Sequence, residues 1–63
     1  MKYEDLELGK RYVIHYNGFY EAATFRGSKY TSDVTTAKLM FDLDNKVVRW
    51  LDYSDLEDKV MEI

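Results

Sequence analysis

Apolar and polar residues alternate along several short stretches of the chain, which is typical of half-buried β-strands. The clearest stretch is residues 36–42, where Ala37, Leu39 and Phe41 share one face and mostly polar residues occupy the other. Because successive side chains of a strand point to opposite faces, this spacing predicts a strand with one side in a core.

Two further stretches predict a β-hairpin near the N-terminus. Residues 10–16 and 19–26 are rich in β-branched and aromatic side chains, and Asn17-Gly18 lies between them. A type I′ turn needs positive φ at both central residues, and Asn-Gly meets this need. We therefore expect the two strands to pair antiparallel around this turn.

The remainder of the chain continues the pattern of short strands and turns. A polar loop is expected over residues 27–33, a fourth strand over 46–51, a helical turn over 54–58 and a fifth strand over 60–63. Outside residues 54–58, a helix is expected only near residues 3–8. The sequence predicts an all-β fold, a small five-stranded barrel with one short helical turn before the last strand, as a single domain over residues 1–63.

The position of Trp50 depends on the register of the third and fourth strands. If Asp44-Asn45 forms a two-residue loop, Leu39 lies opposite Trp50 and the indole is buried. If residues 43–45 form a three-residue loop, Trp50 lies outside with Met40 and Val48 as an apolar patch. A slip of one residue reverses every side chain, so both registers stay open at this point.

The order of these features resembles the Tudor-like and wider SH3-like barrel group. The resemblance rests on Gly9, a strand ending in Tyr16, the segment FYEAATF and the final motif WLDYSDL. It covers residues 8–58. It implies an SH3-like, Tudor-like barrel. The individual motifs are short, and their order and spacing carry the likeness.

In members of that group that bind methylated arginine or lysine, an aromatic cage holds the alkylated cation against ring faces. The matching positions here are Tyr16, Tyr20 and Phe41, with Asn45 as the hydrogen-bonding asparagine. The turn that carries the family's fourth aromatic residue has Asp44 and Asn45 instead, so the resemblance implies an incomplete cage. The alternative is that these rings fill or rim a small barrel.

The composition argues against catalysis, cofactors and metals. The chain has no cysteine and one histidine, which excludes disulfides, thiolate zinc sites and cysteine nucleophiles. We expect His15 on the outer face of its strand, without a nucleophile to activate. No stretch has the roughly 20 apolar residues of a membrane span, so we expect a cytoplasmic protein. Because these catalytic and metal-binding residues are lacking, we also expect a non-enzymatic protein that needs no cofactor.

The net charge of −3 is unevenly distributed, with −2 over residues 1–8, +3 over residues 9–40 and −4 over residues 41–63. We expect a protein-binding module, a small regulator or inhibitor of the kind that phages and mobile elements encode. Its partner site would be an exposed sheet edge, the Met40 and Trp50 patch, or the aromatic rim described above. A monomer and a homodimer formed through an edge strand are both compatible with the sequence.

The alternative function is nucleic-acid binding through the basic first half of the chain. Its candidate residues are five cations and one stacking ring: Lys10, Arg11, Arg26, Lys29, Lys38 and Tyr30. A sequence pI near 4.9 argues against it, because nucleic-acid binders usually have a basic face and a high pI.

Overall fold

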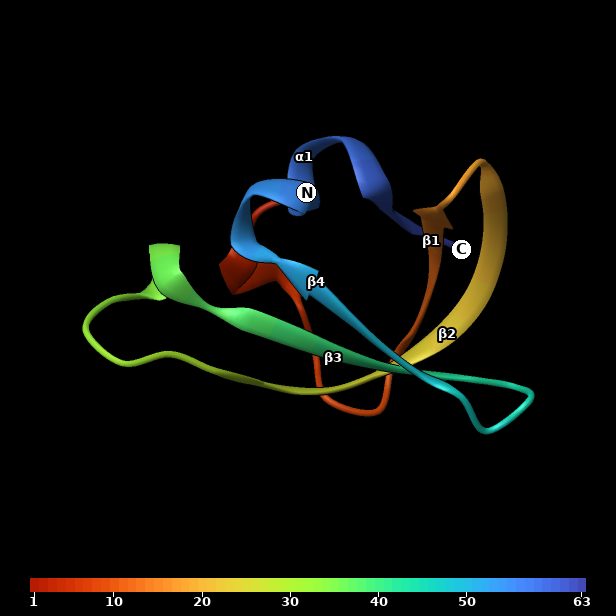
Figure 1. The fold of residues 1–63 in the computed structure, drawn as a ribbon, viewed down its shortest axis with the longest axis horizontal. Coiled ribbons are helices and arrows are strands. Elements are labelled where there is room, and N and C mark those ends of the chain that lie inside the picture. The colour runs from red at the N-terminus through yellow and green to blue at the C-terminus, as the bar shows by residue number, and fades with distance from the viewer.

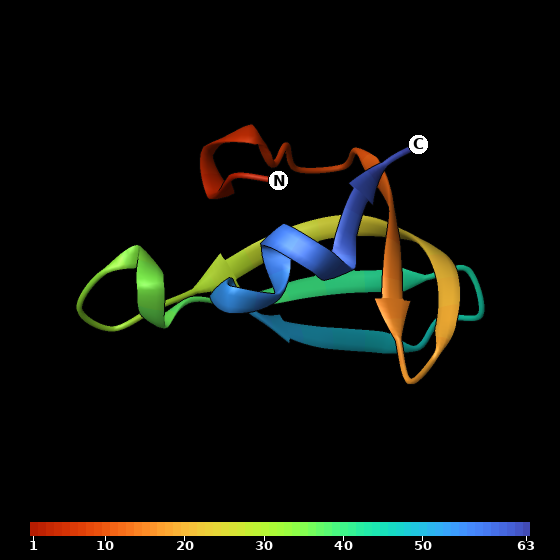
Figure 2. The same ribbon diagram turned by 90° about the horizontal axis from the view of Figure 1, so that it is seen from above.

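The chain forms one antiparallel sheet with the strand order β4-β3-β2-β1-β5 in the computed structural model, which describes residues 1–63 (Figures 1 and 2). The strands are β1 (Arg11–Tyr16), β2 (Phe19–Lys29), β3 (Lys38–Leu43), β4 (Val48–Asp52) and β5 (Val60–Glu62). Three single turns of 3-10 helix, η1 (Tyr3–Asp5), η2 (Val34–Thr36) and η3 (Tyr53–Asp55), and the short helix α1 (Leu56–Lys59) complete the fold. The expected five strands and the helical turn before the last strand are confirmed.

The sheet does not close into a barrel, because the edge strands β4 and β5 do not pair with each other. β2 is the longest strand, and it curves to join the β1–β5 half of the sheet to the β3–β4 half (Figures 1 and 2). Its pairing with β3 shifts register between Phe25 and Gly27, and such bulges bend a strand. β2 also extends to Lys29, so part of the loop expected over residues 27–33 is strand.

The β1–β2 turn has the predicted conformation. Asn17 and Gly18 have φ values of 50° and 81°, and Tyr16 pairs with Phe19 on either side of them. Two successive residues with positive φ are the signature of the type I′ turn. The turn therefore sets the register of β1 against β2.

Neither predicted register of the β3–β4 hairpin is observed. Met40 lies opposite Trp50, because Leu43 pairs with Val47 around a three-residue loop over residues 44–46, one residue later than the proposed three-residue loop. Leu43 is buried, and its backbone N–H donates to Val47 O at 2.8 Å. The Asn45 side chain accepts a hydrogen bond from Val47 N at 3.1 Å, which closes the turn. The outward position of Trp50 beside Met40, one of the two alternatives, is nevertheless the one observed.

The core lies on the inner face of the curved sheet, beneath α1 and the N-terminal segment (Figures 1 and 2). Phe41 occupies its centre, 6.2 Å from the ring of Tyr12 and 5.3 Å from that of Phe25. The eleven buried side chains are all hydrophobic: Tyr12, Ile14, Ala23, Phe25, Ala37, Leu39, Phe41, Leu43, Leu51, Leu56 and Val60. The alternation over residues 36–42 is therefore confirmed, since Ala37, Leu39 and Phe41 all belong to this core.

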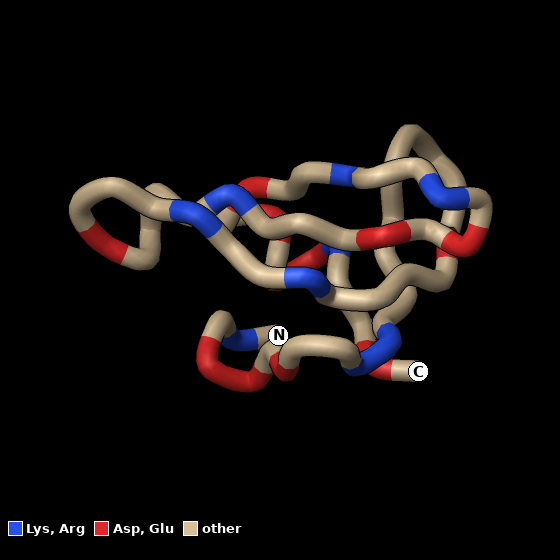
Figure 3. The backbone as a smooth tube through the Cα atoms, turned by 90° about the horizontal axis from the view of Figure 1, so that it is seen from below, with Lys and Arg blue, Asp and Glu red and all other residues tan.

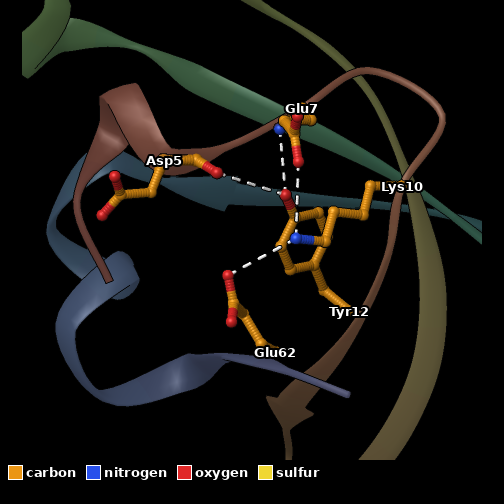
Figure 4. A network of polar contacts seen from close by, with 5 residues as sticks. All are labelled: Asp5, Glu7, Lys10, Tyr12 and Glu62. Atoms are coloured by element: carbon orange, nitrogen blue, oxygen red, sulfur yellow. Dashed lines mark hydrogen bonds and ion pairs between the residues drawn. The ribbon is translucent and has the colours of Figure 1, made fainter.

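Tyr12 fastens the N-terminal segment to the sheet. Its hydroxyl accepts a hydrogen bond from Glu7 N at 2.9 Å and donates to Asp5 O at 3.4 Å (Figure 4). Lys10 Nζ lies 3.4 Å from Glu7 and 3.5 Å from Glu62, so it joins this segment to β5 (Figure 4). The Glu7 carboxylate, followed by the charge of Glu62, raises the pKa of the Lys10 ammonium.

Candidate functional site

The structure does not bring the expected cage residues together. Tyr16 pairs with Phe19 and Tyr20 pairs with His15, so Tyr16 and Tyr20 lie on opposite faces of the hairpin. Phe41 is fully buried in the core, so it cannot form the wall of a surface site. The Asn45 side chain binds the backbone of its own turn. Tyr16, Tyr20, Phe41 and Asn45 therefore form no common rim.

Tyr16 has a partner within the chain. The guanidinium carbon of Arg49 lies 4.4 Å from the centre of the Tyr16 ring, within the range of a cation–π contact. Arg49 also lies 3.6 Å from the carboxylate of Glu21 on β2. These contacts bridge β4 to the β1–β2 hairpin across the inner face, where no backbone pairing closes the sheet. No role was predicted for Arg49 from the sequence. Its position next to Trp50 puts it on the opposite face of β4, and this could have indicated a contact on the inner face.

Tyr20 lies on the outer face near the end of the hairpin. It is 67% exposed, and its ring stacks on His15 with centroids 4.6 Å apart and planes 11° from parallel. The expected outer position of His15 is confirmed by this pairing. The imidazole of His15 therefore packs face to face against a tyrosine ring.

A second exposed group of apolar side chains lies on the outer face of the β2–β3–β4 part of the sheet. We define the Trp50 face as Lys29, Met40, Val48 and Trp50. Trp50 is 46% exposed, and Lys29 Nζ lies 5.8 Å from the centre of its ring. A shallow hollow of about 110 Å³ opens beside the indole, lined by Arg26, Gly27, Ser28, Lys29, Met40 and Trp50. Met40, Val48 and Trp50 were predicted together for this surface as one of the two alternatives, whereas Lys29 was added to it by the strand register.

Ion pairs surround the Trp50 face. Arg26 Nε donates to Asp42 Oδ2 at 2.7 Å, and Lys38 pairs with Asp52 across β3 and β4. Positive and negative residues are interspersed along this part of the chain (Figure 3). Lys29 makes no ion pair, so it is the free cation of the face.

Another ion pair joins β1 to the β3–β4 turn. Arg11 Nη2 lies 2.9 Å from Asp44 Oδ2. The hydrogen bond from Arg11, followed by its positive charge, lowers the pKa of the Asp44 carboxyl, and the same hydrogen bond raises the pKa of Arg11. The turn that carries Asp44 is thus tied to a strand two positions away in the sheet.

The basic residues proposed for nucleic-acid binding are only partly brought together. Arg11, Arg26, Lys29 and Lys38 lie on the outer sheet face, and all of them except Lys29 are paired with carboxylates. Lys10 lies in the network with Glu7 and Glu62. Tyr30 is exposed just after the end of β2. The paired cations have little free charge to offer to phosphates.

No helix in the structure is both long enough and apolar enough to cross a membrane. No protein-family model, curated protein or solved structure matches the chain. The function is therefore inferred from the geometry of the exposed surfaces, among which the Trp50 face combines a large half-exposed ring, apolar neighbours and a surrounding layer of ion pairs.

Proposed function

We propose that this chain is a non-catalytic protein-binding module that holds its partner through the Trp50 face. We also propose that its fold is an SH3-like, Tudor-like one. The support is the linear order of five antiparallel strands, with a strongly curved second strand and a short helical turn before the last strand. These features support the proposal, although the sheet stays open between β4 and β5.

The observation that carries the proposal is the exposure of Trp50 between Met40 and Val48. Binding hot spots are enriched in tryptophan and are surrounded by contacts that exclude water. The ion pairs Arg26–Asp42 and Lys38–Asp52 flank Trp50 in the manner of such a polar rim. The indole is not part of the chain's own core, which supports a role in contact with a partner.

The class of partner and the setting belong to the same proposal. The small size and acidic balance of the chain suit a regulator or inhibitor that acts by occupying a surface, of the kind that phages and mobile elements encode. A cytoplasmic setting agrees with a chain that contains no cysteine. A non-catalytic role is supported by the stacking of the single histidine on Tyr20.

Nucleic-acid binding is the second candidate, because one observation favours it. Four cations share the outer face with Trp50, which could stack on a base: Arg11, Arg26, Lys29 and Lys38. It is the weaker candidate, because phosphate would have to compete with three carboxylates that already bind these cations.

The test compares two lysine substitutions in affinity capture from a lysate of the source cell. Met40→Lys places a charge within the Trp50 face, and Ser32→Lys adds the same charge at an exposed loop position away from it. Far-UV circular dichroism confirms that both variants fold. We expect a protein partner that is retained by the wild type and Ser32→Lys and lost by Met40→Lys, with nuclease present and at high salt.

Two results would decide against the proposal. Equal capture of the same partner by Met40→Lys would show that the Trp50 face is not the site. Recovery of nucleic acid, with affinity that falls by about one log unit per log unit of salt for each phosphate contact, would establish the second candidate instead.

A further inference from the structure

One edge of the sheet carries backbone groups that have no partner in the chain. Leu43 N donates to Val47 O, and Tyr53 N donates to Ala37 O, at the two ends of the β3–β4 ladder. In an antiparallel pair, alternate residues direct their backbone groups toward the neighbouring strand. Odd-numbered residues of β4 therefore bond to β3, and the N–H and C=O groups of Val48 and Trp50 point away from the sheet.

The β4 edge is the more open of the two edges. β4 has five residues, whereas β5, at the other edge, has three and follows directly after α1. Along β4 the side chains of Val48 and Trp50 are exposed, so outward backbone groups and apolar side chains occur at the same residues. An unprotected edge of this kind is a template for another strand.

We propose that β4 pairs antiparallel with β4 of a second copy of this chain, with the two Trp50 residues opposite each other at a twofold axis. The two five-stranded sheets then form one continuous sheet of ten strands. The interface is isologous, since the same strand contributes from both copies. This inference goes beyond the proposed function and does not depend on it.

The backbone groups match this register. Trp50 N–H donates to the C=O of the opposing Trp50, and its own C=O accepts in return. Val48 then lies opposite Asp52 of the second copy and donates its N–H to the C=O of that residue. Asp52 N is already bonded to Asp55 Oδ2 at 2.8 Å, so it needs no further acceptor. Four backbone hydrogen bonds join the two copies, and the bonds between β3 and β4 stay intact.

Side-chain charges favour this register over the one that is shifted by two residues toward the start of β4. Shifting the pairing by two residues toward the start of β4 would set Arg49 opposite Arg49, and like charges directly opposite each other are destabilising. In the proposed register Arg49 lies opposite Leu51.

The pairing also places the two indoles side by side. Directly opposite residues have Cβ atoms about 4.5–5.5 Å apart and share one face of the sheet. The two Trp50 faces thereby become one continuous surface, with a pair of tryptophan rings at its centre. A partner protein would therefore meet both Trp50 faces at once.

Light scattering after size exclusion, over a range of protein concentrations, tests the association directly. We expect a mass of twice 7.5 kDa at high concentration and of 7.5 kDa after dilution. The single tryptophan provides a second signal, since its fluorescence should change with the same concentration dependence. A mass of one chain at every concentration, up to the solubility limit, would overturn the proposal.

Three variants identify the edge that is used. Val48→Pro removes only an outward N–H, and proline is tolerated on edge strands. Trp50→Lys places two charges at the axis, whereas Met61→Lys places the same charge on the β5 edge as a matched control. We expect folded monomers from the first two and a dimer from the third. A dimer that survives Val48→Pro and Trp50→Lys, or that Met61→Lys abolishes, would contradict pairing through β4.

If those variants fail to fold, amide hydrogen exchange of the wild-type chain tests whether β4 pairs with a second copy. In one copy the Trp50 N–H lacks a protein acceptor and exchanges quickly, whereas in the dimer it is bonded and exchanges slowly. We expect its protection to rise with protein concentration. Fast exchange at every concentration, or protection that appears only when a different protein is added, would show that a second copy does not occupy this edge.

Discussion

Phe41 and Trp50 were both expected at a partner surface, and the structure assigns them opposite environments. Phe41 is fully buried between Tyr12 and Phe25, whereas Trp50 is 46% exposed on the other face of the sheet. Replacing each residue in turn by alanine therefore tests the inner and outer assignments independently of any partner. We expect Phe41→Ala to impair folding and Trp50→Ala to leave it nearly unchanged.

The expected magnitudes are far enough apart to measure. A domain of 63 residues is stabilised by about 3–9 kcal/mol, at roughly 0.05–0.15 kcal/mol per residue. Replacing a buried phenylalanine by alanine costs about 3–5 kcal/mol, through lost burial and the cavity that remains. Phe41→Ala should therefore be unfolded or close to it at 25 °C. A substitution on a solvated face usually costs within about 0.5 kcal/mol, and we allow about 1 kcal/mol for the half-buried indole of Trp50.

Urea denaturation followed by far-UV circular dichroism measures both values without relying on tryptophan emission. The samples should be dilute enough to be monomeric, so that loss of a dimer does not add to the cost of Trp50→Ala. Phe41→Leu, which keeps the position apolar, serves as the milder control. The assignment would be refuted if Phe41→Ala unfolded at the wild-type urea concentration, or if Trp50→Ala cost as much as Phe41→Ala.

Three further outcomes follow from individual contacts. Asp44→Asn should destabilise the chain at pH 7, because Arg11 lowers the pKa of Asp44 in the folded state. The stabilisation by Asp44 is complete above the usual aspartate pKa and is lost as the pH falls through the lowered pKa. The melting temperatures of wild type and variant should therefore converge below about pH 4. Tyr12→Phe should cost about 1 kcal/mol in urea titrations, since Glu7 N loses its acceptor, and a cost near zero would indicate that water replaces the hydroxyl. Gly18→Val should cost about 1–2 kcal/mol or more, because a β-branched residue must adopt a φ of 81°, and an unchanged melting temperature would mean that the turn rearranges freely.

Local sequence patterns were sufficient to predict much of the fold. Asn17-Gly18 specifies a turn with positive φ at two successive residues, and this requirement is met by the backbone of those two residues alone. The same turn already implies that Tyr16 and Tyr20 lie on opposite faces, because the side-chain period of a strand is two. Alternation likewise placed Phe41 on the face of Leu39. The expectation of a shared rim came from the resemblance, and it conflicted with the periodicity of the chain's own strands.

The tertiary structure alone decided the side on which Trp50 lies and how the sheet ends. The register of the β3–β4 hairpin depends on the burial of Leu43 and on the hydrogen bonds of the turn after Leu43. The spacing of apolar residues specifies neither the burial nor these hydrogen bonds. Contacts such as Arg49 with Tyr16, or Arg11 with Asp44, join residues more than 30 positions apart. The sequence by itself determined the elements and their inner faces, because those depend on neighbouring residues. Which exposed residues form one surface depended on long-range packing, which exists only once the sheet has curved.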